Sequence, residues 1–317
     1  MGTKRPIIEV PESREYALKI RHEGIKAGWE QRYFLMSDCH WDAPECYLKL
    51  LHEHLREAKD RNALVIDAGD FYEVISGAGD PRSSKGTIRE EHVKVNYLDR
   101  LVEDGVDEFS PYLGNLVYMG TGNHEQAVTI RKETDITQRF VDKASSLRKG
   151  LPPIHRAGYT GWIRFMFERG SQRVSHSMKI EHGTGGNSPV TKGTIQTNRR
   201  SSRTEGATFF VSGHIHEKWN MPLVVETLNS STGRVELREV EHLQLGSYKS
   251  DFRLDGTATW AMMKMGNPKP IGGYWLRFFY KNNRIQWEVQ KAQVDYPNLQ
   301  SYLRKTRVQR EPLRRIA

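Results

Sequence analysis

Short apolar segments alternate with longer segments of mixed polarity through the first two thirds of the chain. Apolar runs bounded by glycine and polar residues are typical of buried strands, and longer mixed stretches are typical of helices. Five of the short segments are each followed directly by carboxylate, amide or imidazole side chains. We expect strands at Tyr33–Met36, Ala63–Ala68, Leu116–Met119, Lys179–Glu181 and Ala207–Ser212.

Helices are expected around these strands, over residues 44–60, 85–103 and 127–148, and one more over 13–27. An alternation of strands and helices is typical of a layered α/β fold. In such folds, sites form at the carboxyl ends of the strands. The polar residues that follow the five strands are therefore expected at one edge of a sheet.

The last third of the chain contains further apolar segments, separated by turn residues such as Asn282-Asn283. They predict a second sheet, whereas the stretch 247–272 is rich in turn residues. These segments are 222–226, 234–246, 273–280 and 284–294. The expected organisation is an N-terminal extension packed on the core (1–31), a main domain (32–296) and a basic C-terminal tail (297–317).

The polar residues after the strands are of the types that bind divalent metals. Residues i and i+2 of an extended chain face the same side, so Asp38 and His40 can grip one ion, while His214 and His216 can serve a close pair of ions. The carboxylate of Asp70 has two oxygens and can bridge two ions. The complete candidate ligand set is Asp38, His40, Asp70, Asn123, His182, His214 and His216. Oxygen and imidazole ligands without thiolate suit Mn, Fe, Zn, Co or Ni.

The motifs differ in how specific they are. Asp-x-His and Gly-Asp occur often by chance, but Gly122-Asn123-His124-Glu125 is expected in well under about 1% of chains of this size, and Gly-His-x-His in on the order of 1%. Here all of them occur in order, each after an expected strand. Two metals at roughly 3.5–4 Å are the usual machinery for hydrolysing phosphate esters.

The series closely resembles the calcineurin-like metallophosphoesterase superfamily, whose pattern is Asp-x-His, Gly-Asp-x-x-Asp, Gly-Asn-His-(Asp or Glu), His and Gly-His-x-His. The match spans residues 38–216. This resemblance implies a four-layer α-β-β-α sandwich, with two mixed sheets face to face and helices outside. It also implies two divalent metal ions, for which we expect Mn, with Fe, Zn, Co or Ni as alternatives.

The resemblance further implies a role for each site residue. The first ion would take Asp38, His40, Asp70 and His216, and the second would take Asp70, Asn123, His182 and His214. A hydroxide that bridges the ions would attack phosphorus. His124 would protonate the leaving group as general acid, and the acidic residue that orients it would be Glu73.

Two positions depart from the superfamily pattern and bear on the substrate. Glu73 stands where family members carry Asp, and its side chain is one methylene longer. Val74 stands where the protein phosphatases of the superfamily carry an Arg that clamps phosphate. The Val therefore counts against a protein phosphatase.

The chain is basic, with a formal net charge of +9 and a pI of about 9.4. A solvated basic surface is the plain interpretation, and a phosphate-rich partner such as nucleic acid is the sharper one. Clusters of cations near the expected site favour the second. The candidate substrate-binding residues are Arg82, Lys85, Arg199, Arg200 and Arg203. Six Arg and Lys residues lie in the tail after residue 300.

Several classes of protein are disfavoured by composition. Mean hydropathy is −0.68, and no apolar run approaches the roughly 20 residues of a membrane span, so no membrane association is expected. Only Cys39 and Cys46 are present and the first residues lack an apolar signal region, so we expect a cytoplasmic protein. The other histidines lack ligand spacing and are expected at surface or satisfied polar positions. They are His22, His52, His54, His92, His155, His176 and His242.

Three functions are compatible with these features. The first is hydrolysis of phosphodiesters of nucleic acid or nucleotides, which combines the ligand series with the basic charge. The second is a phosphomonoesterase that acts on small molecules or proteins. The third, a non-catalytic scaffold on a vestigial metal site, is disfavoured because the ligand set and His124 are complete. The oligomeric state, the exact substrate and the polarity of any cleavage stay open.

Overall fold

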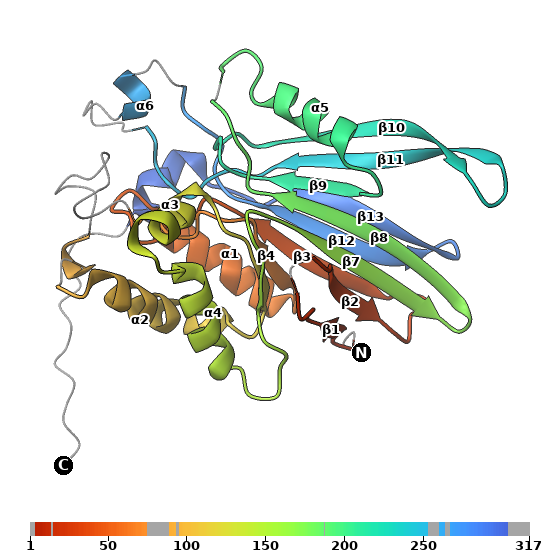
Figure 1. The fold of residues 1–317 in the computed structure, drawn as a ribbon, viewed down its shortest axis with the longest axis horizontal. Coiled ribbons are helices and arrows are strands. Elements are labelled where there is room, and N and C mark those ends of the chain that lie inside the picture. The colour runs from red at the N-terminus through yellow and green to blue at the C-terminus, as the bar shows by residue number, and fades with distance from the viewer. Residues whose placement is uncertain are drawn as a thin grey trace.

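The computed structural model shows two mixed β-sheets packed face to face with helices on their outer sides (Figure 1). The fold class predicted from the sequence is therefore confirmed. The structure describes residues 4–13, 15–74, 89–92, 95–186, 188–252, 260–263 and 267–303. Two predicted substrate contacts, Arg82 and Lys85, and the basic residues after 303 lie outside the described residues.

The six-stranded sheet has the order β13-β12-β3-β4-β5-β6. Its strands β3 to β6 run parallel, and β12 joins β3 antiparallel. Every residue of β4 and β5 is buried, because both faces of this sheet are covered. The strands are β3 (Glu30–Met36), β4 (Leu64–Asp67), β5 (Leu116–Met119), β6 (His155–Arg156), β12 (Tyr274–Lys281) and β13 (Arg284–Lys291).

The seven-stranded sheet has the order β1-β2-β7-β8-β9-β11-β10. It mixes parallel pairs, such as β8 with β9, and antiparallel pairs, such as β7 with β8. Its strands are β1 (Ile7–Glu9), β2 (Leu18–His22), β7 (Thr160–Arg169), β8 (Gln172–Glu181), β9 (Phe209–Ser212), β10 (Trp219–Asn229) and β11 (Arg234–Gln244).

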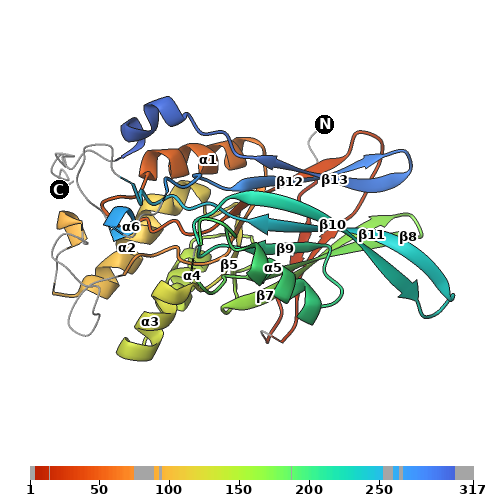
Figure 2. The same ribbon diagram turned by 90° about the horizontal axis from the view of Figure 1, so that it is seen from above.

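Two main cores hold the layers together. Between the sheets, Tyr33 packs edge to face against Phe165 and Phe278, and aliphatic side chains surround these rings. On the other side of the six-stranded sheet, the second core packs against helices α1 (Leu48–Asp60), α2 (Tyr97–Phe109) and α4 (Ile136–Ser146), which lie on that side in Figure 2.

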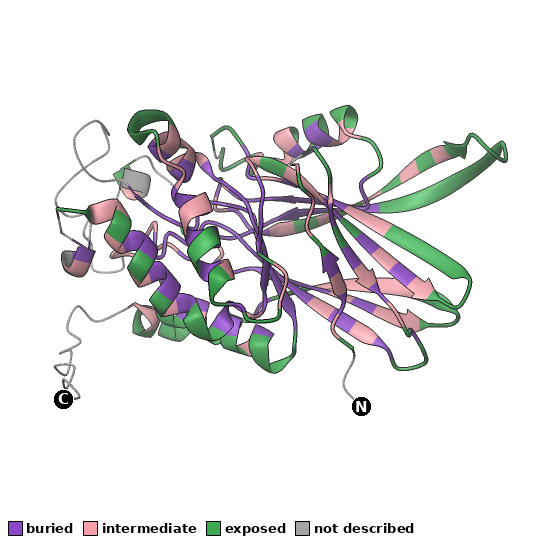
Figure 3. Ribbon diagram, turned by 60° about the horizontal axis from the view of Figure 1, so that its bottom comes forward, coloured by how far each residue is buried: buried purple, intermediate pink, exposed green. Residues whose placement is uncertain are grey.

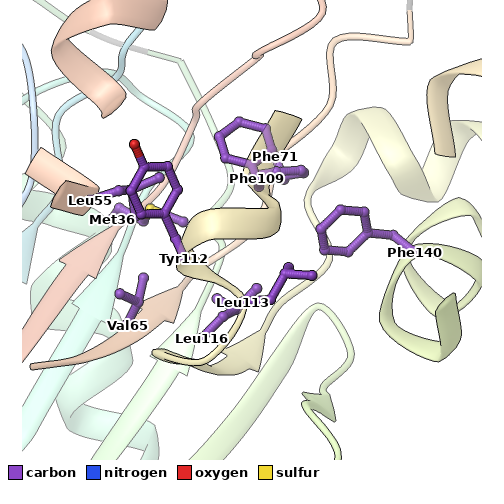
Figure 4. Close-up of a pocket in the computed structure, with 9 residues that line it drawn as sticks. All are labelled: Met36, Leu55, Val65, Phe71, Phe109, Tyr112, Leu113, Leu116 and Phe140. Carbon is purple, nitrogen blue, oxygen red and sulfur yellow. The ribbon is translucent and has the colours of Figure 1, made fainter. Parts of the chain in front are cut away.

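The second core contains a cavity of about 20 Å³ between the sheet and the helices (Figure 4). Its lining is apolar, with Met36, Phe71 and Phe140 among the side chains that surround it. A cavity of this size and polarity has no groups that could hold a water molecule or a charged ligand. It is a packing defect of the core, and the chemistry of the chain lies elsewhere.

The outer face of the seven-stranded sheet is only partly covered. Helix α5 (Thr194–Arg203) lies on this side (Figure 2), and a small apolar cluster of Ala207, Phe210 and Val240 is buried there. The fourth layer is thus a single helix in the described part of the chain. Two further helices, α3 (Asn123–Lys132) and α6 (Trp260–Met263), lie near the end of the molecule where the parallel strands finish (Figure 1).

Strands β10 and β11 extend beyond the sheet as a two-stranded arm (Figure 3). Strand β9 pairs with β11 only at residues 241–244, so residues 223–229 and 234–240 pair with one another alone. The side chains of this arm are largely exposed, including four aliphatic ones that lie at 58–74% exposure. They are Val224, Leu228, Val235 and Leu237.

The helix predicted over residues 13–27 is wrong. This segment contains strand β2, which pairs with β1 and adds parallel to β7. Leu18, Ile20 and His22 are buried, while Lys19 between them is exposed, which is the alternation of a strand with one covered face. The charged residues around it suggested a helix, but the register with β7 decides the conformation.

The helix predicted over 127–148 is two helices, α3 and α4. Glu133 has a left-handed backbone with φ of 53°, which ends α3. Asp135 then caps α4, because its carboxylate accepts the backbone N–H of Gln138 at 2.9 Å. The helix predicted over 85–103 begins later, at Tyr97, and most of the predicted first half lies outside the described residues.

Strands β7 and β8 are longer than the sequence pattern indicated, since only residues 179–181 of this hairpin were predicted. No helix in the described residues is long and apolar enough to cross a bilayer.

Candidate metal centre

The candidate ligands come together at one edge of the molecule, where strands of both sheets end. Asp38 and His40 follow β3, Asp70 follows β4, and Asn123 begins α3 after β5. The imidazoles of the second sheet follow β8 and β9. Because these strands run parallel within each sheet, their carboxyl ends meet at this edge.

Asp38, His40 and His216 form a first group of metal-binding side chains. His216 Nε2 lies 3.5 Å from Asp38 Oδ1, and His40 Nε2 lies 3.9 Å from the same oxygen. Asp38 is also fixed by the backbone, since the N–H of His214 donates to its Oδ2 at 2.9 Å. These are three of the four residues expected at the first ion, and the fourth is Asp70.

Asp70, His182 and His214 form a second group. His182 Nε2 lies 3.1 Å from Asp70 Oδ2. The amide oxygen of Asn123 lies 2.8 Å from His214 Nδ1 and 3.3 Å from His182 Nε2. The four side chains expected around the second ion are therefore in mutual contact distance, with Asp70 on the side of the first group.

A third combination links the two groups. His40, Asp70 and His124 also have candidate ligand atoms within 4.8 Å of one another. Asp70 thus belongs to two of the three combinations found in the described residues, as a bridging carboxylate would.

The backbone at the site is strained. Five of the seven candidate ligands have positive φ angles of 44–73°, a region that side chains other than glycine rarely adopt. Such conformations cost free energy and persist where surrounding structure enforces them, often at functional sites. These five residues are Asp38, His40, Asp70, His214 and His216.

Two glycines make room for the carboxylates. A Cβ atom at Gly122 would lie 1.9 Å from Asp70 Oδ1, and one at Gly213 would lie 2.3 Å from Asp38 Oδ2. Any side chain at either position would displace a candidate ligand. The glycines of the two sequence motifs are therefore explained by close approach of the backbone to Asp70 and Asp38.

The ring nitrogens of three histidines are divided between the cluster and a supporting oxygen. His40 Nδ1 lies 2.7 Å from Glu73 Oε2, His182 Nδ1 lies 3.1 Å from the carbonyl of Ala68, and His216 Nδ1 lies 2.5 Å from Asp251 Oδ2. In each case Nε2 is left to face the cluster. Metal-binding histidines have this arrangement, because the second contact fixes the tautomer and the orientation of the ring.

The donors of both groups suit divalent cations. In the described part of the chain, His40 Nε2 is buried and makes no hydrogen bond, which is costly unless another partner exists. Carboxylate, amide and imidazole donors are the ligands of Mn, Fe, Zn, Co and Ni. The residues present therefore fit the metals that the motif resemblance implies.

The charges of the cluster are strongly coupled. Burial raises the pKa of Asp38, but the hydrogen bond from His216 and the charge of His182 lower it to about 2. Burial lowers the pKa of His182, yet the Asp70 carboxylate raises it to about 9. In the absence of a cation, His182 therefore carries a proton near neutral pH and balances part of the carboxylate charge. A metal ion would displace this proton.

His124 lies beside the cluster, and Glu73 supports it in an unexpected way. The Nδ1 atom of His124 lies 2.7 Å from the backbone carbonyl of Glu73 and 4.0 Å from its carboxylate. The carboxylate instead contacts His40 and accepts a hydrogen bond from Lys249 at 2.6 Å. The carbonyl of Glu73 therefore orients His124, and the longer side chain supports a candidate ligand.

Two buried carboxylates that sequence reasoning missed hold the loop after β4. Asp42 accepts the N–H groups of Glu73 and Val74 at 2.6 and 3.0 Å. Glu125 accepts the N–H groups of Asp70 and Tyr72 at 3.2 and 2.9 Å, besides that of Gly122. Glu125 belongs to the Gly-Asn-His-Glu motif, which is the signal that identifies its position, but its supporting role depends on the fold.

The basic residues of α5 have different surroundings. Arg199 is exposed, Arg203 pairs with Glu181 at 2.6 Å, and Arg200 is buried. Arg200 reaches towards the ligand loop, since a Cβ added at Gly183 would lie 3.4 Å from its Nη2. Burial lowers the pKa of Arg200. Of these three cations, Arg200 is the one that lies beside Gly183, which follows the candidate ligand His182.

Comparisons with known proteins give little further information. No protein-family model matches the chain, and no curated protein matches its sequence. Solved structures that align with it include Vacuolar Protein Sorting 29 from Cryptosporidium parvum, at 13% identity and a TM-score of 0.33 over 84% of this chain and 100% of that one. GAP50, the anchor in the inner membrane complex of Plasmodium, aligns at 10% identity and a TM-score of 0.36 over 90% and 98%.

A single mutant of Vps29 from Entamoeba histolytica aligns at 10% identity and a TM-score of 0.33, over 83% of this chain and 100% of that one. At these scores the alignments carry no argument about chemistry. The functional assignment therefore depends on the residues of the site themselves.

Proposed function

We propose that this protein is a two-metal phosphoesterase that hydrolyses phosphodiesters of nucleic acid or nucleotides. The observation that carries the proposal is that all seven candidate ligands lie together in two groups. The two groups adjoin at Asp70, and His124 lies beside them. Such an arrangement of carboxylate, amide and imidazole groups suits two divalent ions.

The expected assignment of ligands follows from the two groups. Asp38, His40 and His216 would hold one ion, Asn123, His182 and His214 the other, and Asp70 both. When bound, two such ions supply a hydroxide nucleophile near neutral pH and neutralise the charge of the phosphate.

The chain supplies the proton for the leaving group. His124 Nδ1 faces the carbonyl of Glu73, so this nitrogen donates and the ring orientation is fixed. Its Nε2 faces the cluster at 3.9 Å from Asp70 Oδ2. A proton on Nε2 would therefore pass to the departing oxygen of a phosphate ester held at this edge.

The preference for diesters of nucleic acid is supported by charge. The net charge of +9 and the buried cation Arg200 beside Gly183 favour a substrate that carries several phosphates. Val74 is buried and provides no cation for a single phosphate group, which favours a diester over a protein phosphomonoester.

The test compares substrates and a matched variant. Purified protein with Mn²⁺ is assayed on bis-p-nitrophenyl phosphate, on p-nitrophenyl phosphate, and on labelled single- and double-stranded DNA and RNA, beside D70A. We expect metal-dependent cleavage of diesters that is lost in D70A. A preference for the monoester would overturn the nuclease assignment in favour of a small-molecule phosphatase. Bound metal without hydrolysis of any ester would overturn the enzyme assignment in favour of a scaffold.

A further inference from the structure

The segment of residues 247–252, which follows β11, contacts the first metal group at several points. Ser247 Oγ donates to the carbonyl of Asp38 at 2.9 Å, and the N–H of Tyr248 donates to the same oxygen at 3.0 Å. Asp251 then reaches one histidine of this group directly, and Lys249 reaches another through Glu73. The segment lies outside the sequence motifs of the candidate ligands.

Asp251 contacts His216 directly. Its Oδ2 lies 2.5 Å from His216 Nδ1, so the ring is held with Nε2 towards Asp38. The supporting group is a carboxylate, which accepts a hydrogen bond from the Nδ1–H group of His216. A carboxylate in this position makes an imidazole a stronger metal donor than a neutral carbonyl does.

Lys249 acts on His40 through Glu73. The ammonium group of Lys249 donates to Glu73 Oε1 at 2.6 Å, while Glu73 Oε2 contacts His40 Nδ1 at 2.7 Å. Glu73 is only 3% exposed, so its carboxylate is costly to bury without the cation. Lys249 thereby holds the Glu73 carboxylate in place against His40.

The second metal group has no comparable support in the described residues. The Nδ1 of His182 faces the neutral carbonyl of Ala68, and Asn123 contributes an uncharged amide. The two groups therefore differ in the charge that stands behind their ligands. Two carboxylates back the histidines of the first group, and a backbone carbonyl backs a histidine of the second.

We infer that Lys249 and Asp251 are positioning residues that hold His40 and His216 for one metal ion, and that they make this position the tighter of the two. The inference rests on the proposed function only in that the site binds two divalent ions. The difference in affinity between the two metal positions is thereby attributed to a segment outside the ligand motifs.

The test measures metal binding, without reference to turnover. Full-length metal-free protein is titrated with Mn²⁺ by calorimetry, in the wild type and in two variants that each retain one position. H182A removes a ligand of the second group, and H216A removes one of the first. D251N is then introduced into the H182A background and into the H216A background.

We expect D251N to weaken Mn²⁺ binding by about 10–100-fold in the H182A background and to leave binding in the H216A background unchanged. K249M is expected to weaken the same position, and D251E to restore part of the affinity. The Mn²⁺ electron paramagnetic resonance spectrum of the H182A protein should change with D251N, because the orientation of a ligand changes.

D104N is the matched control. Asp104 lies 3.5 Å from His92 Nε2, so the variant removes a carboxylate from a histidine outside both metal groups. We expect it to bind Mn²⁺ as the wild type does. Circular dichroism of each variant at the titration temperature establishes that the protein is folded.

Equal weakening of both positions by D251N, or unchanged affinity in the H182A background, would overturn the inference. If such a protein still binds two ions and hydrolyses phosphate esters, the proposed function stands and only the role of Lys249 and Asp251 fails. A wild type that binds no divalent ion would overturn both.

Discussion

The two ring nitrogens of His124 have different surroundings, and this difference defines what the residue can do. One is held by the carbonyl of Glu73 and the other faces Asp70 at 3.9 Å. The ring is near the ligands, but its supporting oxygen is a backbone carbonyl, whereas His40 and His216 are supported by side-chain carboxylates. Its expected role is transfer of a proton.

Replacing His124 should therefore slow catalysis and leave metal binding intact. We expect H124Q to lower kcat by about 10²–10⁴-fold on a dinucleotide, whose leaving alcohol needs a proton, and by less on bis-p-nitrophenyl phosphate. Metal content is measured in parallel by atomic emission. Loss of an ion from H124Q would show that His124 is a ligand, contrary to its assigned role.

A second histidine links pH to stability. His176 lies between the aromatic rings of Phe278 and Trp287, and burial lowers its pKa to about 4. The unfolded chain would bind a proton at about pH 6.5. Between these values the unfolded state binds more protons, so stability falls as the pH falls from 6.5 to 4.

We expect H176F to lose this contribution. The pH dependence of its unfolding free energy should be shallower by up to about 1.4 kcal/mol per pH unit in this window. Urea unfolding of metal-free protein at several pH values measures the two slopes. Parallel slopes for wild type and variant would contradict the assignment of a neutral, partly buried His176.

At the scale of elements, the start of α3 is built around Gly122. Three N–H groups, those of Gly122, Asp70 and Tyr72, converge on the Glu125 carboxylate. The loop after β4 and the first turn of α3 are thereby fixed to one another. Asp70 is held between them with its carboxylate against Gly122.

The variant G122A should disrupt this junction. Its Cβ would meet Asp70 Oδ1 at 1.9 Å and the backbone nitrogen of Asp70 at 2.4 Å, so Asp70 must move. We expect a loss of about 1–3 kcal/mol of stability and at least tenfold weaker binding of both ions. G114A, at a glycine with open space around it, is the control for chemical denaturation and calorimetry.

The sequence indicated the elements that carry ligands more reliably than the others. The strands before Asp38, Asp70, Asn123 and His214 were visible as apolar runs, whereas β8 before His182 was predicted only at Lys179–Glu181. The N-terminal segment misled, because the charged residues around Leu18 and Ile20 are compatible with a helix until β7 is known to lie beside them. The local periodicity of a sequence does not show which distant strands pair with one another.

The same limit applies to the site. The candidate ligands stand in motifs with fixed spacing, so they could be selected by inspection. Lys249 and Asp251 lie in an irregular segment without period or motif, and only the fold brings them to Glu73 and His216. The Glu73 carboxylate was expected to orient His124. Whether it reaches that ring depends on the fold, and in the structure it contacts His40 instead.

At the scale of the whole molecule, the site joins both sheets. Its candidate ligands extend from Asp38 to His216 along the chain and come from five loops. No single sheet carries a complete ligand set for either ion. Divalent metal should therefore bind only the folded protein and stabilise it by mass action.

We expect Mn²⁺ at 100 times its dissociation constant to add about 2.7 kcal/mol for each ion. This corresponds to an increase of roughly 4 °C in Tm for one ion in a chain of this size. Differential scanning calorimetry with and without Mn²⁺ measures the shift. D70A should show little of it, and an equal shift in D70A would place the stabilising ion elsewhere.

The arm formed by residues 223–229 and 234–240 has a different relation to the rest of the molecule. Its strands pair only with each other, and an isolated two-stranded hairpin is marginally stable in water. The arm can therefore open without breaking a hydrogen bond between β11 and β9. Local unfolding of this kind proceeds at a much lower free energy than global unfolding.

Amide hydrogen exchange should distinguish local opening of the arm from global unfolding. We expect peptides from the arm to exchange at least a hundredfold faster than peptides from β3 and β4, in both metal-free and metal-bound protein. Equal protection of the arm and the central strands would show that the arm is held by contacts beyond its own pairing. The protein would otherwise behave as two cooperative units, an arm that frays continually and a pair of packed sheets that opens only on global unfolding.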